Sequence, residues 1–143
     1  MRVMALDMGT KRVGVAVSDA MGWTAQGLEV MAREPREAFY TAIEKLVREH
    51  EVERLVLGLP RRMDGTLGPE AQRVLAVRKD LEERLSIEVT TWDERLSTAA
   101  AERVLLEADM SRRKRKKVVD KVAATFILQG YLDYLSASGG NRP

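Results

Sequence analysis

Short apolar runs separated by turn residues fill the first quarter of the chain. Residues 3–6 form one run, and residues 12–18 form a second after a connection too short for a helix. Two strands joined so closely must pair in antiparallel fashion. A third run, residues 28–31, follows predicted turns at Gly22 and Gly27. The pattern therefore predicts a three-stranded antiparallel meander.

Helical and strand patterns alternate through the rest of the chain. Apolar positions recur at helical spacing over residues 35–50 and again from Pro69 to Leu81, with a proline in the first turn of each segment. Residues 54–59 are almost continuously apolar, as in a strand buried on both faces, and residues 88–92 are rich in β-branched and aromatic residues. Two more helices are predicted, over residues 101–108 and over about 116–135.

This order of elements predicts an α/β fold. We expect a five-stranded mixed sheet, built from the three-stranded antiparallel meander and two parallel strands and flanked by about four helices. Right-handed crossovers would make the first, fourth and fifth strands parallel, so that their carboxyl ends meet at one edge. The 143 residues, 45% of them hydrophobic, fit a single domain, which we expect to span residues 1–135 with a flexible tail at 136–143.

Charged residues follow each of the three strands that are expected to be parallel. Asp7 follows the first strand, Arg61 and Arg62 follow the fourth, and Asp93 and Glu94 follow the fifth. Ligands of open α/β sheets bind beyond the carboxyl ends of parallel strands. The predicted topology therefore brings these acids and bases to one site, although Asp7 taken alone could equally cap a turn.

The hairpin after Asp7 has features of a metal and phosphate site. Gly9 is expected to adopt the positive φ that a tight turn demands, while Thr10 and Lys11 add a hydroxyl and a cation. The chain has no cysteine, and its one histidine, His50, falls at a predicted helix end where a structural role is the better interpretation. Carboxylates in this setting favour Mg²⁺ or Mn²⁺ over zinc.

Position alone leaves two choices among the acids open. Asp120 begins the last predicted helix beside an apolar stretch, so it could be drawn toward the sheet, or it could simply pair with Lys116 or favour the helix N-terminus. Asp93 and Glu94 are equally suited by charge to bind a metal. Either of these neighbours could also be a solvated loop acid.

Positive charge is concentrated in one segment rather than abundant. The chain has 24 Lys and Arg against 22 Asp and Glu, yet six consecutive cations fill positions 112–117. Because these charges repel one another, the run is more consistent with binding to a polyanion than with a first helical turn that contacts only solvent. Acids that bind metals and bases that hold phosphates together predict a nuclease. The residues expected to contact nucleic acid are Thr10, Lys11, Arg12, Arg61, Arg62, Arg95, Arg112, Arg113, Lys114, Arg115, Lys116 and Lys117.

The sequence also predicts a location for the protein. It contains no cysteine, no apolar run of membrane-spanning length and no apolar signal-peptide core after Met1. We therefore expect a cytoplasmic protein with no membrane partner.

Four separated blocks carry a resemblance to a known family. In chain order they are Leu6 to Asp19, Val56 to Pro60 with Met63 to Thr66, Trp92 to Thr98, and Lys117 to Ala124. Together they resemble the YqgF family of RNase H-like nucleases, also called RuvX or Holliday junction resolvases, from Met1 to about Leu135. Arg61 departs from the family pattern, because members more often carry an apolar residue after the proline.

The resemblance implies an RNase H-like fold, with Asp7, Glu94 and Asp120 as the acidic site, and it selects Glu94 over Asp93. Asp7 would bridge two divalent ions, Mg²⁺ or Mn²⁺, and the other two acids would each hold one, so that an activated water attacks phosphorus in line. The resemblance also implies nucleolytic maturation of the 5′ end of the 16S rRNA precursor. One small domain with a single acidic site makes one cut per binding event, whereas junction resolution needs two, so RNA is the favoured substrate.

Three alternatives compete with this interpretation. A junction-resolving endonuclease would act on branched DNA and would need a homodimer to make two symmetric cuts. An actin-like ATPase or sugar kinase has a similar phosphate-binding hairpin, but such proteins close two lobes around a nucleotide and this chain has room for one. A nucleic-acid-binding module without catalysis would need only the basic run, and the acids in three blocks argue against it.

Overall fold

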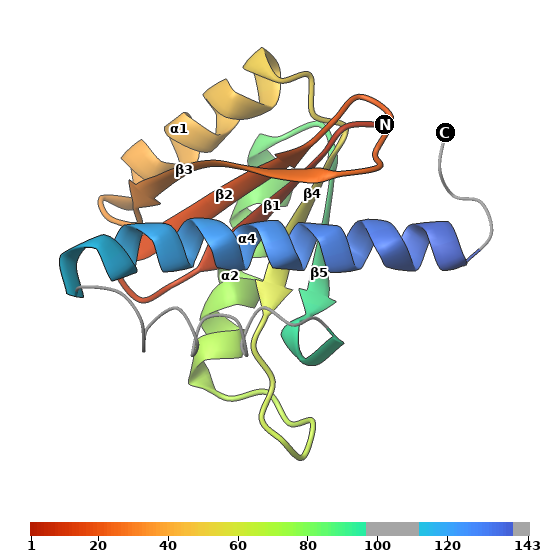
Figure 1. Ribbon diagram of the computed structural model, residues 1–143. Helices are drawn as coiled ribbons and strands as arrows, with labels where there is room; N and C mark the ends of the chain where they lie inside the picture. The colour runs from red at the N-terminus through yellow and green to blue at the C-terminus, as the bar shows by residue number, and fades with distance from the viewer. Residues whose placement is uncertain (97–111, 139–143) are drawn as a thin grey trace.

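The computed structural model describes residues 1–96 and 112–138; for residue 96 and residues 112–120 it describes the backbone alone. One five-stranded sheet forms the centre, with helices on both faces (Figure 1). The strands are β1 (Val3–Met8), β2 (Arg12–Ser18), β3 (Ala25–Ala32), β4 (Arg54–Leu59) and β5 (Glu88–Asp93). The helices are α1 (Arg36–Glu49), α2 (Pro69–Arg84), the 3-10 helix η1 (Glu94–Leu96) and α4 (Arg112–Ala137).

The strands lie in the order β3-β2-β1-β4-β5 across the sheet. β1 pairs with β2, and β2 with β3, in antiparallel fashion, which confirms the predicted meander. β4 pairs in parallel with β1 on one side and with β5 on the other. The α/β fold class and the five-stranded mixed sheet expected from the sequence are therefore confirmed. The carboxyl ends of β1, β4 and β5 lie at one edge, as the predicted topology required.

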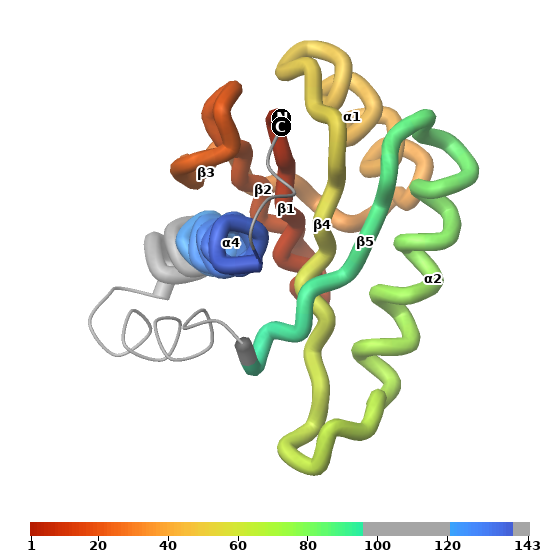
Figure 2. Tube along the Cα trace, turned by 90° about the vertical axis from the view of Figure 1, so that its right-hand side faces the viewer, coloured from red at the N-terminus to blue at the C-terminus, as the bar shows by residue number. Residues whose placement is uncertain are grey.

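The described helices lie on both faces of the sheet. α1 and α2 lie on one face, where Ile43 packs in a core that includes Leu57 of β4, and α4 is the one described helix across the other face (Figure 2). On the α4 face, Ile127 packs with Ala5 and Val56 in a separate core. Side chains alternate between the faces along each strand, so adjacent strand residues belong to different cores. The position of a residue in its strand therefore tells which face its side chain occupies.

Of the two glycines predicted to form turns in the meander, one lies elsewhere. Gly22 lies in the turn after β2, as expected, and has a φ of 73°. Gly27 lies inside β3 rather than in a turn, opposite Ala16 at a register shift, because β3 begins at Ala25 and not at Leu28. A Cβ on Gly27 would come within 2.8 Å of Lys121 Cγ, so α4 packs against bare backbone at this point.

Gly9 was expected to adopt a positive φ, and this prediction is wrong. Its φ lies outside the left-handed region. A Cβ on Gly9 would instead come within 2.8 Å of the Arg12 carbonyl oxygen, to which the Gly9 N–H donates a hydrogen bond of 2.9 Å. The turn therefore needs glycine because two backbone segments approach closely, and not because of a special dihedral angle.

The last helix is longer than its apolar pattern indicated. α4 begins at Arg112 rather than near Lys116, so the cationic run forms its first turns and Asp120 lies inside the helix instead of opening it. It ends at Ala137, within the segment expected to be a tail. The helix predicted over residues 101–108 lies outside the described residues, and the described ranges contain three α-helices against about four expected. None of these described helices is long and apolar enough to cross a membrane.

Candidate active site

Asp7 is a buried acid at the carboxyl end of β1, with 3% of its surface exposed. It alternates with Val3 and Ala5, which belong to the core under α4, so its side chain occupies the same face. Its register partner on β2 is Gly14, which has no side chain to fill the neighbouring space. Aspartate is almost never buried to this extent unless it is paired or binds a metal. Asp7 therefore has the burial expected of a functional acid.

Glu94 lies on the same face as Asp7, over the neighbouring strand β4. The parallel register pairs Leu6 of β1 with Leu57 of β4, so the next residues along the two strands, Asp7 and Gly58, are neighbours. A Cβ on Gly58 would come within 3.1 Å of Glu94 Oε1 and within 2.6 Å of Ile127 Cδ1. Ile127 belongs to α4, so this side of Gly58 faces that helix. The Glu94 carboxylate thus lies over the bare backbone of Gly58, next to the strand that carries Asp7.

Asp120 lies in the part of α4 for which the backbone alone is described. Position 120 precedes Ala124 by about one helical turn, and Ala124 and Ile127 pack on the sheet. By helical periodicity, position 120 falls on the side of α4 that faces the sheet. Of the three predicted acids, Asp7 and Glu94 are those with described side chains. No group of three metal-binding side chains is found among the described residues.

Asp93 lies on the opposite face and is bound by arginines. It is in register with Leu59, whose side chain belongs to the core under α1 and α2. Asp93 Oδ2 accepts a hydrogen bond of 2.8 Å from Arg95 Nη2, and Arg61 Nε lies 3.6 Å from the same oxygen. The hydrogen bond from the Arg95 side chain is the main cause that holds the pKa of Asp93 below its ordinary value. Geometry therefore separates Glu94 from its neighbour, which sequence position could not do.

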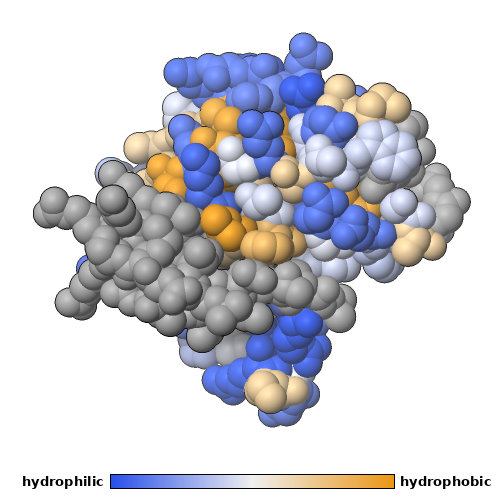
Figure 3. Space-filling view, in the orientation of Figure 1, coloured by the Kyte–Doolittle hydropathy of each residue, from blue (hydrophilic) through white to orange (hydrophobic). Residues whose placement is uncertain are grey.

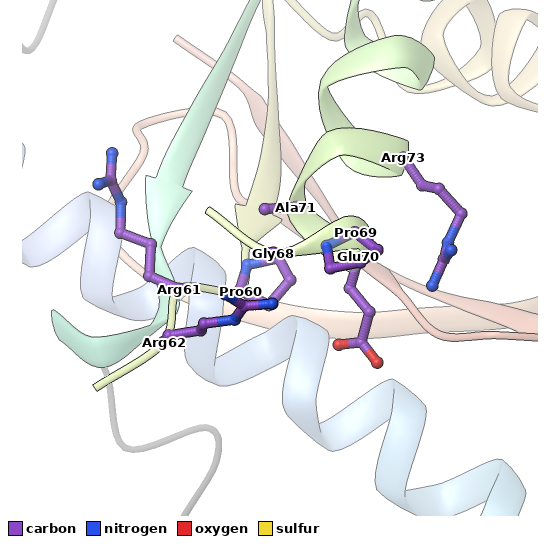
Figure 4. Close-up of a pocket in the computed structure, with 8 residues that line it drawn as sticks. All are labelled: Pro60, Arg61, Arg62, Gly68, Pro69, Glu70, Ala71 and Arg73. Atoms are coloured by element: carbon purple, nitrogen blue, oxygen red, sulfur yellow. The ribbon is translucent and has the colours of Figure 1, made fainter. Parts of the chain in front are cut away.

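A basic pocket of about 350 Å³ opens where β4 leads into α2. Arg61 turns away from the pocket toward the end of β5, whereas Arg62 lies against Gly68 (Figure 4). Neither Arg62 nor Arg73 has a side-chain ion pair with any described residue. The pocket thus offers cations at the edge of the sheet that carries the acids. Its lining residues are Pro60, Arg61, Arg62, Gly68, Pro69, Glu70, Ala71 and Arg73.

The remaining predicted contact residues lie in two places. Thr10 and Lys11 are exposed in the turn between β1 and β2. Arg12 is half-buried, and its position in β2 alternates with Gly14, which places it on the face of Asp7. Its Nη1 atom is buried without a hydrogen-bond partner in the described structure. The cations at 112–117 lie in the first turns of α4, and their side chains are outside the described part.

Sequence reasoning missed the glycines that make room for the acids. Gly58 interrupts an otherwise apolar strand, and a glycine inside a strand often marks a close approach by another group. Gly14 interrupts β2 in the same way, opposite Asp7. Both signals were present in the sequence, but only the strand register shows that the two glycines flank the same aspartate on its two neighbouring strands.

Solved structures show which fold this protein shares. RuvC of Thermus thermophilus in complex with a Holliday junction substrate has a TM-score of 0.60 at 12% identity, over 100% of this chain and 99% of that chain. The Holliday junction resolvase of fowlpox virus has a TM-score of 0.52 at 15% identity, over 96% and 99%. At these identities the likeness shows the fold alone. The protein thus has the RNase H-like fold of RuvC-type resolvases.

Sequence comparison then identifies the family. Residues 1–134 match the family described as "RuvX: Holliday junction resolvase". A relative from Moorella thermoacetica is 55% identical over 139 residues, or 97% of this chain and 99% of its own. One from Bacillus cytotoxicus is 56% identical over 135 residues, or 93% and 98%. Both are named "Putative pre-16S rRNA nuclease". The chain belongs to the RuvX family, which confirms the resemblance found in its motifs.

Proposed function

We propose that this protein is a nuclease that hydrolyses phosphodiester bonds with the help of divalent metal ions and processes the 5′ end of the 16S rRNA precursor. The observation that carries the proposal is the placement of Asp7 and Glu94 on one face of the sheet, separated by the bare backbone of Gly58. Two carboxylates brought together from β1 and η1 are suited to bind cations that act on a phosphate. The names of the closely similar relatives support the RNA substrate.

The described residues fit a hard divalent cation. The donors are carboxylate oxygens, which Mg²⁺ and Mn²⁺ prefer, and the chain has no cysteine to attract a softer metal. The bare backbone of Gly58 lets the Glu94 carboxylate approach this part of the sheet closely. When bound, such ions would lower the pKa of a water molecule and offset the charge that develops on the phosphate oxygens. We infer that Asp7, Glu94 and Asp120 would hold these ions.

The basic residues would bind and orient the substrate backbone. Arg12 lies on the same face as the two acids, so its guanidinium is suited to hold a phosphate close to them. Arg62 and Arg73 lie at the basic pocket on the neighbouring part of the edge, and Lys11 is exposed in the first turn. Such contacts give affinity without reading base sequence. Selection would then come from the shape of the substrate.

Resolution of Holliday junctions in recombination and repair is the second candidate function. The family description and the fold shared with RuvC favour it. A resolvase must make two symmetric cuts, so it needs two acidic sites, and one chain supplies one. The resolvase function therefore requires a homodimer, whereas cleavage of a flexible RNA strand requires a single site. We favour RNA for this reason.

A cleavage panel separates the two functions. Equal amounts of a labelled 16S precursor leader, a linear DNA duplex and an immobile four-way DNA junction would be incubated with the protein at one salt concentration and one Mg²⁺ concentration. We expect cleavage of the leader at a defined 5′ position. Paired symmetric nicks in the junction, made by a stable dimer that leaves the leader intact, would reverse the order of the two candidates.

A further inference from the structure

The connection between β4 and α2 projects from the edge of the sheet at which the acids lie (Figures 1 and 2). It comprises residues 60–68, and we call it the edge loop. Met63 lies in the edge loop with 98% of its surface exposed, far more than Met21 at 56% or Trp23 at 53%. In the space-filling view, the lower end of the molecule carries a small pale-orange, weakly hydrophobic area among hydrophilic residues (Figure 3).

Hydrogen bonds within the edge loop hold Met63 in this exposed position. The Arg62 N–H donates to the Thr66 carbonyl at 3.0 Å, and the Gly65 N–H donates to the Arg62 carbonyl at 2.8 Å. Asp64 Oδ1 accepts hydrogen bonds from the Thr66 N–H at 2.9 Å and from its hydroxyl at 2.7 Å. Gly65 has a φ of 87°, which favours glycine and closes the turn. The exposure of Met63 is therefore a property of a defined turn.

Two arginines pack against the turn of the edge loop on the side that faces β5. Arg61 Nη1 donates to the Gly65 carbonyl at 3.0 Å. A Cβ on Gly65 would lie 3.7 Å from Arg95 Nη1, so that guanidinium also packs against the turn. Arg95 directly follows Glu94 in η1, which links the loop to the acidic site. The apolar tip is thus presented among cations, beside one of the two described acids.

This combination matches the chemistry of a nucleic acid whose bases are not fully stacked. Phosphates alternate with flat apolar base faces along such a strand, so cations next to an apolar side chain complement it. Methionine is among the apolar side chains that wedge between base steps in proteins that bend or open nucleic acids. Arg61, Arg62 and Arg95 lie in or next to the edge loop that carries Met63, and an apolar protein partner would make no use of these charges. The charge around Met63 therefore favours a nucleic acid.

We propose that Met63 is a wedge residue that packs against unstacked bases of the substrate, while Arg61 and Arg62 meet the flanking phosphates. The inference rests on the proposed nuclease function and deepens it, since it adds a preference for substrate structure. Unstacking costs little in single strands and at branch points and more within a continuous duplex. The edge loop would thus favour substrates that are single-stranded or branched next to the acids.

Binding measurements on matched substitutions test the wedge. Affinities of the wild type, Met63→Ala, Met63→Leu and Met21→Ala would be measured for a single-stranded 16S leader RNA and for a fully paired RNA duplex of equal length. Loss of the apolar contact should weaken binding of Met63→Ala to the single strand by at least about fivefold. Met63→Leu keeps the apolar volume, and Met21→Ala removes an exposed methionine at the β2–β3 turn, so both should bind within about twofold of the wild type.

Two further readouts define the mode of contact. The slope of log affinity against log salt should be the same in Met63→Ala and wild type, because no phosphate contact is lost. The fluorescence of a 2-aminopurine base in the leader should increase when wild type binds, because the wedge unstacks that base. The increase should be smaller when Met63→Ala binds. Equal losses on single strand and duplex, or no loss at all, would overturn the wedge and leave the nuclease proposal standing. Failure of the wild type to bind either RNA would overturn both.

Discussion

The Glu94 side chain lies directly over Gly58, so close that a Cβ on that glycine would come within 3.1 Å of Glu94 Oε1. The same Cβ would come within 2.6 Å of Ile127 Cδ1, a distance that side chains do not tolerate without movement. Gly58 also lies beside Asp7 on the adjacent strand. One missing side chain therefore lets an acid from η1 and a core residue from α4 meet next to the buried aspartate.

Replacement of this glycine should damage the site more than the fold. Gly58→Ala should lower the rate of phosphodiester cleavage at least about tenfold, because Glu94 must move, and should lower the free energy of unfolding by about 1–3 kcal/mol through overpacking. Cleavage of a labelled RNA leader and urea unfolding measure the two effects.

A second substitution separates the effect of Gly58→Ala on stability from its effect on activity. Ile127→Val removes the Cδ1 atom that makes the closer contact, so Gly58→Ala combined with Ile127→Val should recover stability relative to Gly58→Ala alone. Activity should stay low, because the contact with Glu94 remains. Recovery of full activity together with stability would show that Gly58 serves only core packing.

The acids should act as one unit. Glu94→Gln and Asp120→Asn should each reduce cleavage by at least about a hundredfold, and the double variant should be little worse than either, because ligands of the same ions are not additive. Initial rates at saturating Mg²⁺ give the comparison. Losses that multiply in the double variant would indicate independent roles and count against a shared ion site.

Asp93 should support stability rather than the chemistry. Its carboxylate accepts hydrogen bonds from Arg95, and the depressed pKa means that the charged form is favoured in the folded state. Asp93→Asn should therefore lower the melting temperature at pH 7 by roughly 2–6 °C. The divalent-dependent rate should fall much less than in Glu94→Gln.

The pH dependence of this effect has a defined sign. A group with a depressed folded-state pKa stabilises the protein above its ordinary value, here 3.8, and the stabilisation is lost as the pH falls through the lower folded-state pKa. The difference in melting temperature between wild type and Asp93→Asn should be constant from about pH 5 to 7 and shrink below that ordinary value. A difference that grows in acid would contradict the arginine contacts.

The cationic turns of α4 should contribute affinity that depends on salt. Replacement of Arg112, Arg113 and Lys114 by Ala should weaken RNA and DNA binding across sequences. Each lost phosphate contact should reduce the log-log salt slope by roughly 0.7 for a single strand or 0.9 for a duplex. Fluorescence anisotropy at several salt concentrations measures the slope. A slope equal to that of the wild type would mean that these side chains are only solvated.

The pattern of apolar residues was sufficient to predict the central sheet and its topology. Apolar runs at 3–6, 54–59 and 88–92 identified strands, and the order of helices between them required parallel pairing, which brings their ends together. Asp7 and Glu94 were accordingly predicted to converge, and the structure places them on adjacent parts of one face. Such patterns succeed because burial on a pleated strand imposes a period of two.

The remaining features depend on contacts between distant segments. The β3 strand begins earlier than its apolar run indicates because Ala25, Gln26 and Gly27 also pair with β2. Gly27 in addition allows the close approach of Lys121. Asp93 and Glu94 differ only through the faces they occupy, which follow from the strand register and from the end of β5. Neither the three-dimensional partners of Gly58 nor the exposure of Met63 can be read from local sequence.

The most direct test of the account is the divalent-dependent cleavage of a 16S precursor leader by wild type and by Asp7→Asn. The substitution keeps the size of the buried side chain and removes the charge that would hold the ions, so we expect cleavage in Mg²⁺ or Mn²⁺ to fall by at least about a thousandfold while the melting temperature changes little. EDTA should abolish the wild-type activity. Full activity in Asp7→Asn, or cleavage by wild type that survives EDTA, would contradict the assignment of this site.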